Sequence, residues 1–155
     1  MSTKMSPYDV RRRNHGEMLE ETVLEELIID KVIEPIYQWE NLFRPQRAQP
    51  FFATKNGSSE QPLDEVAYVY DKYYRRKKAC IIEIKAMRAV DWHDWKTNNI
   101  MHVDKLQQHR KHIYNAKVHK LDGVCIITVN KDSSEYWIKC FNKDNLPMEA
   151  WDYPY

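Results

Sequence analysis

The sequence predicts a single α+β domain (an α/β arrangement of one central mixed β-sheet flanked by helices). Helical and strand patterns alternate along the chain in the order helix, hairpin, helix, hairpin, which favours one sheet with helices packed on it. The chain has 155 residues, of which 43% are hydrophobic, and this is enough for one core. Only three glycines are present, which argues against a phosphate-binding glycine loop and against glycine-based repeats.

The first helix is expected from Gly16 to about Ile36, because apolar residues such as Val23 and Leu27 recur at steps of three and four. Pro35 is expected to end or kink it. Residues 1–13 are polar and are expected to form a flexible basic arm ahead of a single domain at 14–155. The proline-rich residues 44–62 are predicted to be a loop, with a short strand at 51–54.

Two hairpins are predicted. The first joins EVAYVYDKYY (65–74) to ACIIEIKAM (79–87), with the basic RRKK segment (75–78) as its turn. The second joins GVCIITVN (123–130) to EYWIKCF (135–141). Between the hairpins, AVDWHDWKTNN (89–99) has no regular pattern, and a helix is expected from about Val103 to His119. Trp92 and Trp95 either stack on nucleic-acid bases or pack beneath a loop.

The three cysteines, Cys80, Cys125 and Cys140, each lie in an apolar run without CxxC spacing. This pattern predicts free thiols in a reduced, cytoplasmic protein, or in the host cytoplasm if the protein is viral. No apolar run approaches the length of a membrane span, about 20 residues, so no membrane partner is expected.

Four histidines, at 102, 109, 112 and 119, recur at helical intervals in the second predicted helix. A zinc site needs three or four converging ligands, and these histidines have no cysteine or second histidine pair at finger spacing. Polar histidines on a helix face are the favoured interpretation.

The net charge of +1 gives no global argument for nucleic-acid binding, but the charges are clustered. Arg11, Arg12 and Arg13 form one basic block, which is either a polar tail or an arm that neutralises phosphates. The basic block at 75–78 is favoured as a solvated hairpin tip.

Glu83 and Lys85 stand out because they interrupt an otherwise apolar strand. Strand alternation places Cys80, Ile82 and Ile84 on one face and Ile81, Glu83 and Lys85 on the other. An unpartnered charge inside a sheet is costly, so the pair belongs either to a wet edge or to a site.

A hairpin turn centred on Arg76–Lys77 is expected to bring Asp71 opposite Ile82 or Glu83. Two carboxylates on neighbouring strands beside Lys85 suit Mg²⁺, with Mn²⁺ as a substitute, and Lys85 would position the attacking water. Glu20 shares a helix face with Leu24 and Leu27 and is a candidate for a third acid at this site.

These residues resemble the PD-(D/E)xK nuclease superfamily. Asp71, then Glu83-x-Lys85 on the second strand of a hairpin, then a helix, are similar to its core, and the resemblance spans about 14–151. Within the superfamily the pattern is closest to Holliday-junction resolvases of the RecU and archaeal types. Their G-x-x-x-E opening resembles Gly16-x-x-x-Glu20, and the segment from Lys105 to His112 resembles the following helix.

The resemblance implies a restriction-endonuclease-like core and a metal site made by Glu20, Asp71, Glu83 and the backbone carbonyl of Ile84. It also implies that Gln107 or Gln108 lies near the site and that the chain acts as a homodimer on a four-way junction. Lys105 and the Arg11–Arg13 block are further candidates for contacting DNA because of their positive charge. The motif departs from the family because Tyr70 precedes Asp71 in place of proline. Pro62-Leu63-Asp64 is set aside, because the expected register puts Asp64 opposite Ala89 or Val90.

The expected function is therefore a Mg²⁺-dependent DNA endonuclease in which Asp71, Glu83 and Lys85 are catalytic. DNA, duplex or branched, is the expected partner. Two alternatives stay open: a general viral or phage nuclease of double-stranded DNA without junction specificity, and a non-catalytic nucleic-acid-binding domain on the same fold.

Overall fold

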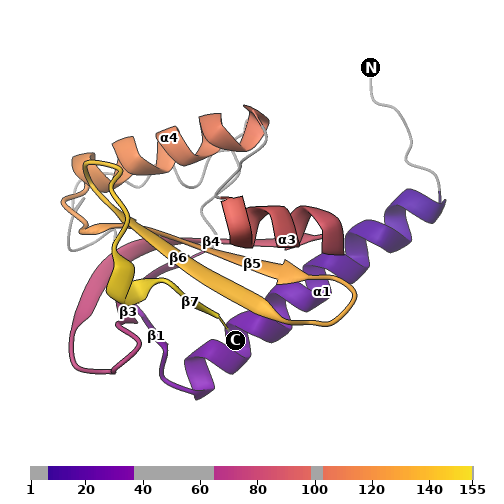
Figure 1. The fold of residues 1–155 in the computed structure, drawn as a ribbon, viewed down its shortest axis with the longest axis horizontal. Helices are drawn as coiled ribbons and strands as arrows, with labels where there is room; N and C mark the ends of the chain where they lie inside the picture. The colour runs from indigo at the N-terminus through magenta and orange to yellow at the C-terminus, as the bar shows by residue number, and fades with distance from the viewer. Residues whose placement is uncertain (1–6, 37–64, 99–102, 155) are drawn as a thin grey trace.

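A computed structural model describes residues 7–36, 65–98 and 103–154 and has one mixed sheet at its centre (Figure 1). The elements in chain order are α1 (Pro7–Ile29), β1 (Ile33–Pro35), β3 (Glu65–Tyr70), β4 (Lys77–Met87), α3 (Ala89–Asn98), α4 (Val103–Val118), β5 (Gly123–Asn130), β6 (Tyr136–Asn142), the 3-10 turn η2 (Glu149–Trp151) and β7 (Tyr153–Pro154). The six strands lie in the order β1-β3-β4-β5-β6-β7. The pair β4–β5 is parallel and the other neighbouring pairs are antiparallel. The predicted fold class, a mixed sheet flanked by helices, is confirmed.

Strand β4 separates two cores, as its alternation predicts. Cys80, Ile82 and Ile84 belong to the core on the α1 side, which includes Val23 and Leu27 of α1. Ile81 belongs to the opposite core with Trp95 of α3 and Ile113 of α4. Helix α1 therefore covers one face of the sheet, and α3 and α4 cover the other (Figure 1).

The first helix begins and ends earlier than the sequence predicted. It begins at Pro7, so residues 7–13, which were expected to be an arm, are helical. It ends at Ile29 because Lys31 adopts a left-handed conformation (φ 61°). The amides of Lys31 and Val32 then donate to the carbonyls of Ile28 and Leu27, which is the Schellman pattern of helix ends. Pro35 does not end the helix; it lies in β1, an edge strand that tolerates proline.

Residues 89–98, expected to be irregular, form helix α3. Its two tryptophans, Trp92 and Trp95, are 1% and 2% exposed, and Trp92 Nε1 donates to the Thr128 carbonyl over 3.0 Å. The packing interpretation is therefore confirmed for both, and base stacking by these rings is ruled out by their burial.

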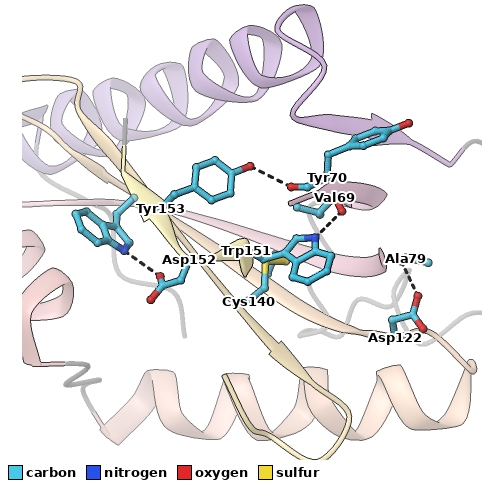
Figure 2. The surroundings of a disulfide bond; sticks show 10 residues. Val69, Tyr70, Ala79, Asp122, Cys140, Trp151, Asp152 and Tyr153 are labelled. Carbon is cyan, nitrogen blue, oxygen red and sulfur yellow. Dashed lines mark hydrogen bonds between the residues drawn. A yellow bond between two sulfur atoms is a disulfide. The ribbon is translucent and has the colours of Figure 1, made fainter. Parts of the chain in front are cut away.

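The expectation of three free thiols is wrong. Cys125 and Cys140 face each other across the β5–β6 ladder and are joined by a disulfide, whereas Cys80 is free and buried (Figure 2). The C-terminal segment packs beside this bond, where Trp151 Nε1 donates to the Val69 carbonyl over 2.8 Å. The C-terminal turn is thus fixed to β3.

Within the three described ranges, no helix is both long enough and apolar enough to cross a membrane. The strand expected at 51–54 lies outside the described residues.

Candidate active site at the end of β4

Glu83 and Lys85 lie where β4 extends beyond β3. The described ladder between these strands stops at Glu65, which pairs with Ile82. From Glu83 to Met87 the strand continues in parallel with β5. Both side chains point to the α4 side of the sheet and are partly buried, as alternation predicts. Ligands of mixed and parallel sheets commonly bind at such carboxyl ends.

The register of the hairpin corrects the position of Asp71. The expected turn was centred on Arg76–Lys77, but Tyr70 pairs with Lys77 and the amide of Asp71 donates to the Arg76 carbonyl. Asp71 therefore lies at the hairpin turn, seven strand residues away from Glu83. At about 3.3 Å per residue this is roughly 23 Å, too far for a shared metal ion.

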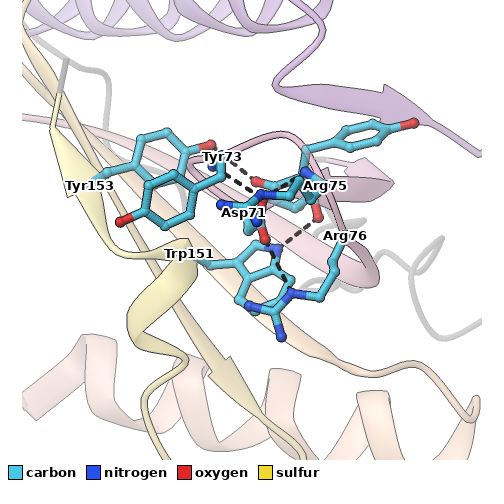
Figure 3. Close-up of polar contacts among 8 residues, drawn as sticks. Asp71, Tyr73, Arg75, Arg76, Trp151 and Tyr153 are labelled. Atoms are coloured by element: carbon cyan, nitrogen blue, oxygen red, sulfur yellow. Dashed lines mark hydrogen bonds and ion pairs between the residues drawn. The ribbon is translucent and has the colours of Figure 1, made fainter.

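Asp71 has a structural role instead (Figure 3). Its side chain is 2% exposed and accepts hydrogen bonds from the amides of Tyr73 and Arg75, at 3.1 and 2.9 Å, and from Arg76 Nε at 3.2 Å. The pKa of Asp71 is lowered, first by the Arg75 amide and further by the Arg76 guanidinium and the Tyr73 amide, although burial opposes the shift. A carboxylate with this many donors holds a turn together.

Glu20 reaches the end of β4 from the other side of the sheet. Helix α1 packs on this strand, and Glu20 Oε2 accepts a hydrogen bond from the Ala86 amide over 3.0 Å. The pKa of Glu20 is raised, chiefly because burial disfavours the carboxylate. The Ala86 amide and the Lys85 ammonium lower it, and the Glu83 carboxylate raises it further. Glu20, Glu83 and Lys85 are thus within electrostatic reach of one another.

Gly16 explains how α1 comes this close. It is buried one helical turn before Glu20, and a Cβ atom there would lie 3.7 Å from Ala86 Cβ and 3.5 Å from Lys131 Cε. Lys131 follows β5 directly, and its amide donates to the Met87 carbonyl. Lys131 therefore brings a second amine to this edge of the sheet, a residue that sequence analysis missed.

His112 of α4 is a second missed residue. Its Nε2 lies 2.7 Å from Glu83 Oε1, and the two side chains are 11% and 20% exposed. Because an ionised carboxylate can only accept, the hydrogen belongs to Nε2 and the ring donates it. His112 Nδ1 is buried without a hydrogen-bond partner among the described residues. The helical spacing of the histidines was the available signal, but it did not show which ring meets Glu83.

The other predicted contacts are placed as follows. Ile84 lies two residues before Ala86, so its backbone groups face the edge of the strand that Glu20 reaches. Gln108 is exposed on α4, one turn before His112. Three further predicted contacts have a helical backbone: Lys105, Gln107 and the Arg11–Arg13 block. The positions of their side chains are not among the described parts of the structure.

The residues at this edge suit a hard cation. In the described residues no group of three histidine, cysteine or acidic side chains has metal-binding spacing. Mg²⁺ needs fewer protein ligands, because it binds through one or two carboxylates and keeps several waters. Glu20 from one face of the sheet, Glu83 from the other and the Ile84 carbonyl at the strand edge are the oxygen donors available to such an ion, and the pKa of Glu20 is raised chiefly because burial disfavours its charged form.

Comparison with known proteins found no match to the chain among family models, curated proteins or solved structures.

Proposed function

We propose that the chain is a Mg²⁺-dependent DNA endonuclease whose site lies at the carboxyl end of β4. The observation that carries this proposal is the meeting of Glu20 with the Glu83-x-Lys85 strand. Glu20 comes from a helix 66 residues away in sequence from the amide that it binds. Acids with a perturbed pKa that distant chain segments bring to one place are functional-site candidates.

In this mechanism Glu20 and Glu83 would hold the metal ion, with the Ile84 carbonyl as a further oxygen donor. The bound ion would supply charge stabilisation for the phosphate and a more acidic water. Lys85 orients the attacking water, and Lys131 offers a positive charge to the substrate phosphate. His112 fixes the rotamer of Glu83 through its Nε2–H, as second-layer partners of metal ligands do.

The primary test is cleavage of a synthetic four-way junction and of a linear duplex in Mg²⁺, with Glu83→Gln compared with wild type. The glutamine side chain still accepts the His112 hydrogen bond, so the fold should persist while the charge is lost. The cleavage rate should fall at least about a thousandfold, roughly 4 kcal/mol. Glu21→Gln, at an exposed position of α1, is the matched control and should cleave normally.

The substrate separates the remaining possibilities. Paired symmetric nicks on the junction alone support a resolvase, and a homodimer in sedimentation would agree with it. Cleavage of both substrates supports a general duplex nuclease. If the wild type binds DNA but cuts neither substrate in Mg²⁺ or Mn²⁺, the hydrolase proposal fails and the non-catalytic domain replaces it.

Asp64 belongs in the same assay. It lies outside the described residues, and the register that set it aside is wrong, because the next residue, Glu65, pairs with Ile82. Asp71→Asn should cleave at the wild-type rate once DNA is saturating. A loss in Asp64→Asn alone would identify the third acid of the motif, whereas a loss in Asp71→Asn alone would contradict the placement of the site.

A further inference from the structure

The turn of the β3–β4 hairpin carries an exposed basic and aromatic surface, here called the hairpin tip (residues 72–78). Five of its seven residues are basic, and the other two are Tyr73 and Tyr74. These rings are 59% and 48% exposed. Large exposed aromatic rings beside a cluster of like charges are unusual in a turn that only faces solvent. Such a turn needs neither the rings nor the charge cluster.

The tip has a fixed shape. Asp71 binds the amides of Tyr73 and Arg75 and the guanidinium of Arg76, so the backbone is held from inside (Figure 3). Tyr74 has a left-handed backbone (φ 57°), a conformation that glycine adopts at lower cost. Tyrosine therefore occupies a position whose backbone conformation favours glycine. Residues in such strained conformations are often found at binding sites.

Cation–π contacts also order the basic groups. Lys72 Nζ and Arg75 Cζ lie 5.8 and 5.3 Å from the centre of the Tyr73 ring, and Arg76 Cζ lies 5.0 Å from the Trp151 ring. The tip contains no acid; Asp71 beneath it pairs with Arg76, and Glu34 of β1 pairs with Lys77 over 3.5 Å. The result is a preorganised cluster of positive charge with aromatic edges.

We propose that the hairpin tip binds nucleic acid, with Lys72 and Arg75 contacting phosphates and Tyr74 packing against sugars or bases. Ordered basic groups can contact successive phosphates, and exposed aromatic rings can stack on bases. A partner protein with an acidic surface would use the basic groups but would not need the aromatic rings. The tip lies at the opposite end of β4 from Glu83, so it is a second surface. Its binding is independent of hydrolysis.

The test measures binding of a fluorescent linear duplex by anisotropy in EDTA, where no metal-dependent cleavage occurs. Lys72→Ala/Arg75→Ala leaves the Asp71–Arg76 pair intact. Removing each phosphate-binding side chain should reduce the slope of log affinity against log salt by about one, and affinity at about 0.1 M salt should fall roughly fiftyfold. Lys111→Ala/Lys117→Ala removes the same charge from exposed positions on α4 and should change affinity little.

Tyr74→Gly provides a variant that should fold, because glycine suits the left-handed backbone. Its affinity for a single-stranded oligonucleotide should fall several-fold while its melting temperature is kept or raised. Equal reductions of affinity in the Lys72/Arg75 and Lys111/Lys117 variants would show diffuse charge attraction and overturn the proposal. Unchanged binding in the Lys72/Arg75 variant would also overturn it, and neither result would affect the proposed cleavage site.

Discussion

The carboxylates near the two ends of β4, Asp71 and Glu20, have pKa shifts of opposite direction. At the turn, Asp71 accepts from two amides and a guanidinium, and its pKa is lowered. At the other end, Glu20 accepts from a single amide, and burial raises its pKa. The first acid has its charge satisfied by the protein. The second is partly desolvated and has fewer hydrogen-bond donors to offset that cost.

This difference distinguishes Asp71, which has a structural role, from Glu20, which is proposed to bind a metal ion. A carboxylate that already accepts several hydrogen bonds has little capacity for a ligand, whereas a partly desolvated one with a single hydrogen bond gains more by binding a cation. Four variants test this comparison.

Glu20→Gln should have the largest effect. Cleavage should fall roughly 100- to 1,000-fold, or about 3–4 kcal/mol, because a metal-binding charge is removed. A raised pKa means that ionised Glu20 destabilises the fold at neutral pH, and the glutamine amide oxygen still accepts from Ala86. The free energy of unfolding in EDTA should therefore rise. Denaturant titration measures the free energy of unfolding, and single-turnover kinetics measure the cleavage rate. A lower free energy of unfolding in the variant would contradict the destabilising role of ionised Glu20.

His112→Phe should lower the cleavage rate about 10- to 100-fold, because Glu83 loses the group that orients it. His112→Gln should recover part of the rate by restoring an N–H donor. His109→Phe is the control: His109 lies three residues earlier on α4, is also buried, and bonds to Asn145 at 2.7 Å. Similar rate losses in both phenylalanine variants would point to a general packing role.

Asp71→Asn should lower the melting temperature by a few degrees at neutral pH without changing cleavage at saturating DNA. The lowered pKa stabilises the fold above the ordinary aspartate pKa, about 3.9. This advantage is lost as pH falls through the lower folded-state pKa. The difference in melting temperature between wild type and variant should therefore shrink at acidic pH, and thermal melts at a series of pH values measure it. A constant gap would show that the turn does not depend on the charge.

Gly16→Ala should have the smallest effect, a stabilisation of about 0.5–1 kcal/mol from higher helix propensity. Its new Cβ would meet Ala86 and Lys131 at ordinary contact distances. Gly123→Ala is the contrasting variant, because a Cβ there would collide with the Phe141 carbonyl oxygen, and this variant should be strongly destabilised. Denaturant midpoints compare the two, and destabilisation by Gly16→Ala would show that the helix must lie closer to β4.

Short-range periodicity predicted much of the site. Alternation along β4 correctly placed Glu83 and Lys85 on the face opposite Ile82 and Ile84. Steps of four and seven from Glu20 to Leu24 and Leu27 correctly turned this acid toward the sheet. Both patterns depend on local geometry, which the sequence encodes directly.

Hairpin register was predicted wrongly because it depends on turn chemistry. The expected turn lay in the basic run at 75–78, whereas the Asp71 side chain closes a turn centred between Tyr73 and Tyr74. Aspartate at the end of a strand commonly begins a turn, so the sequence did contain a cue to the correct position of this turn. The Glu83–His112 contact had no such signal, because it joins elements that only the folded sheet brings together.

The hydrogen bond between Glu20 and Ala86 also has a consequence for the order of folding. Its partners are 66 residues apart, and closing so long a segment is entropically costly and comes late. A nascent chain or partly folded intermediate would have β4 and its glutamate, but no opening helix seated against it. If the proposed cleavage activity is present, it would then appear only after α1 has packed on β4.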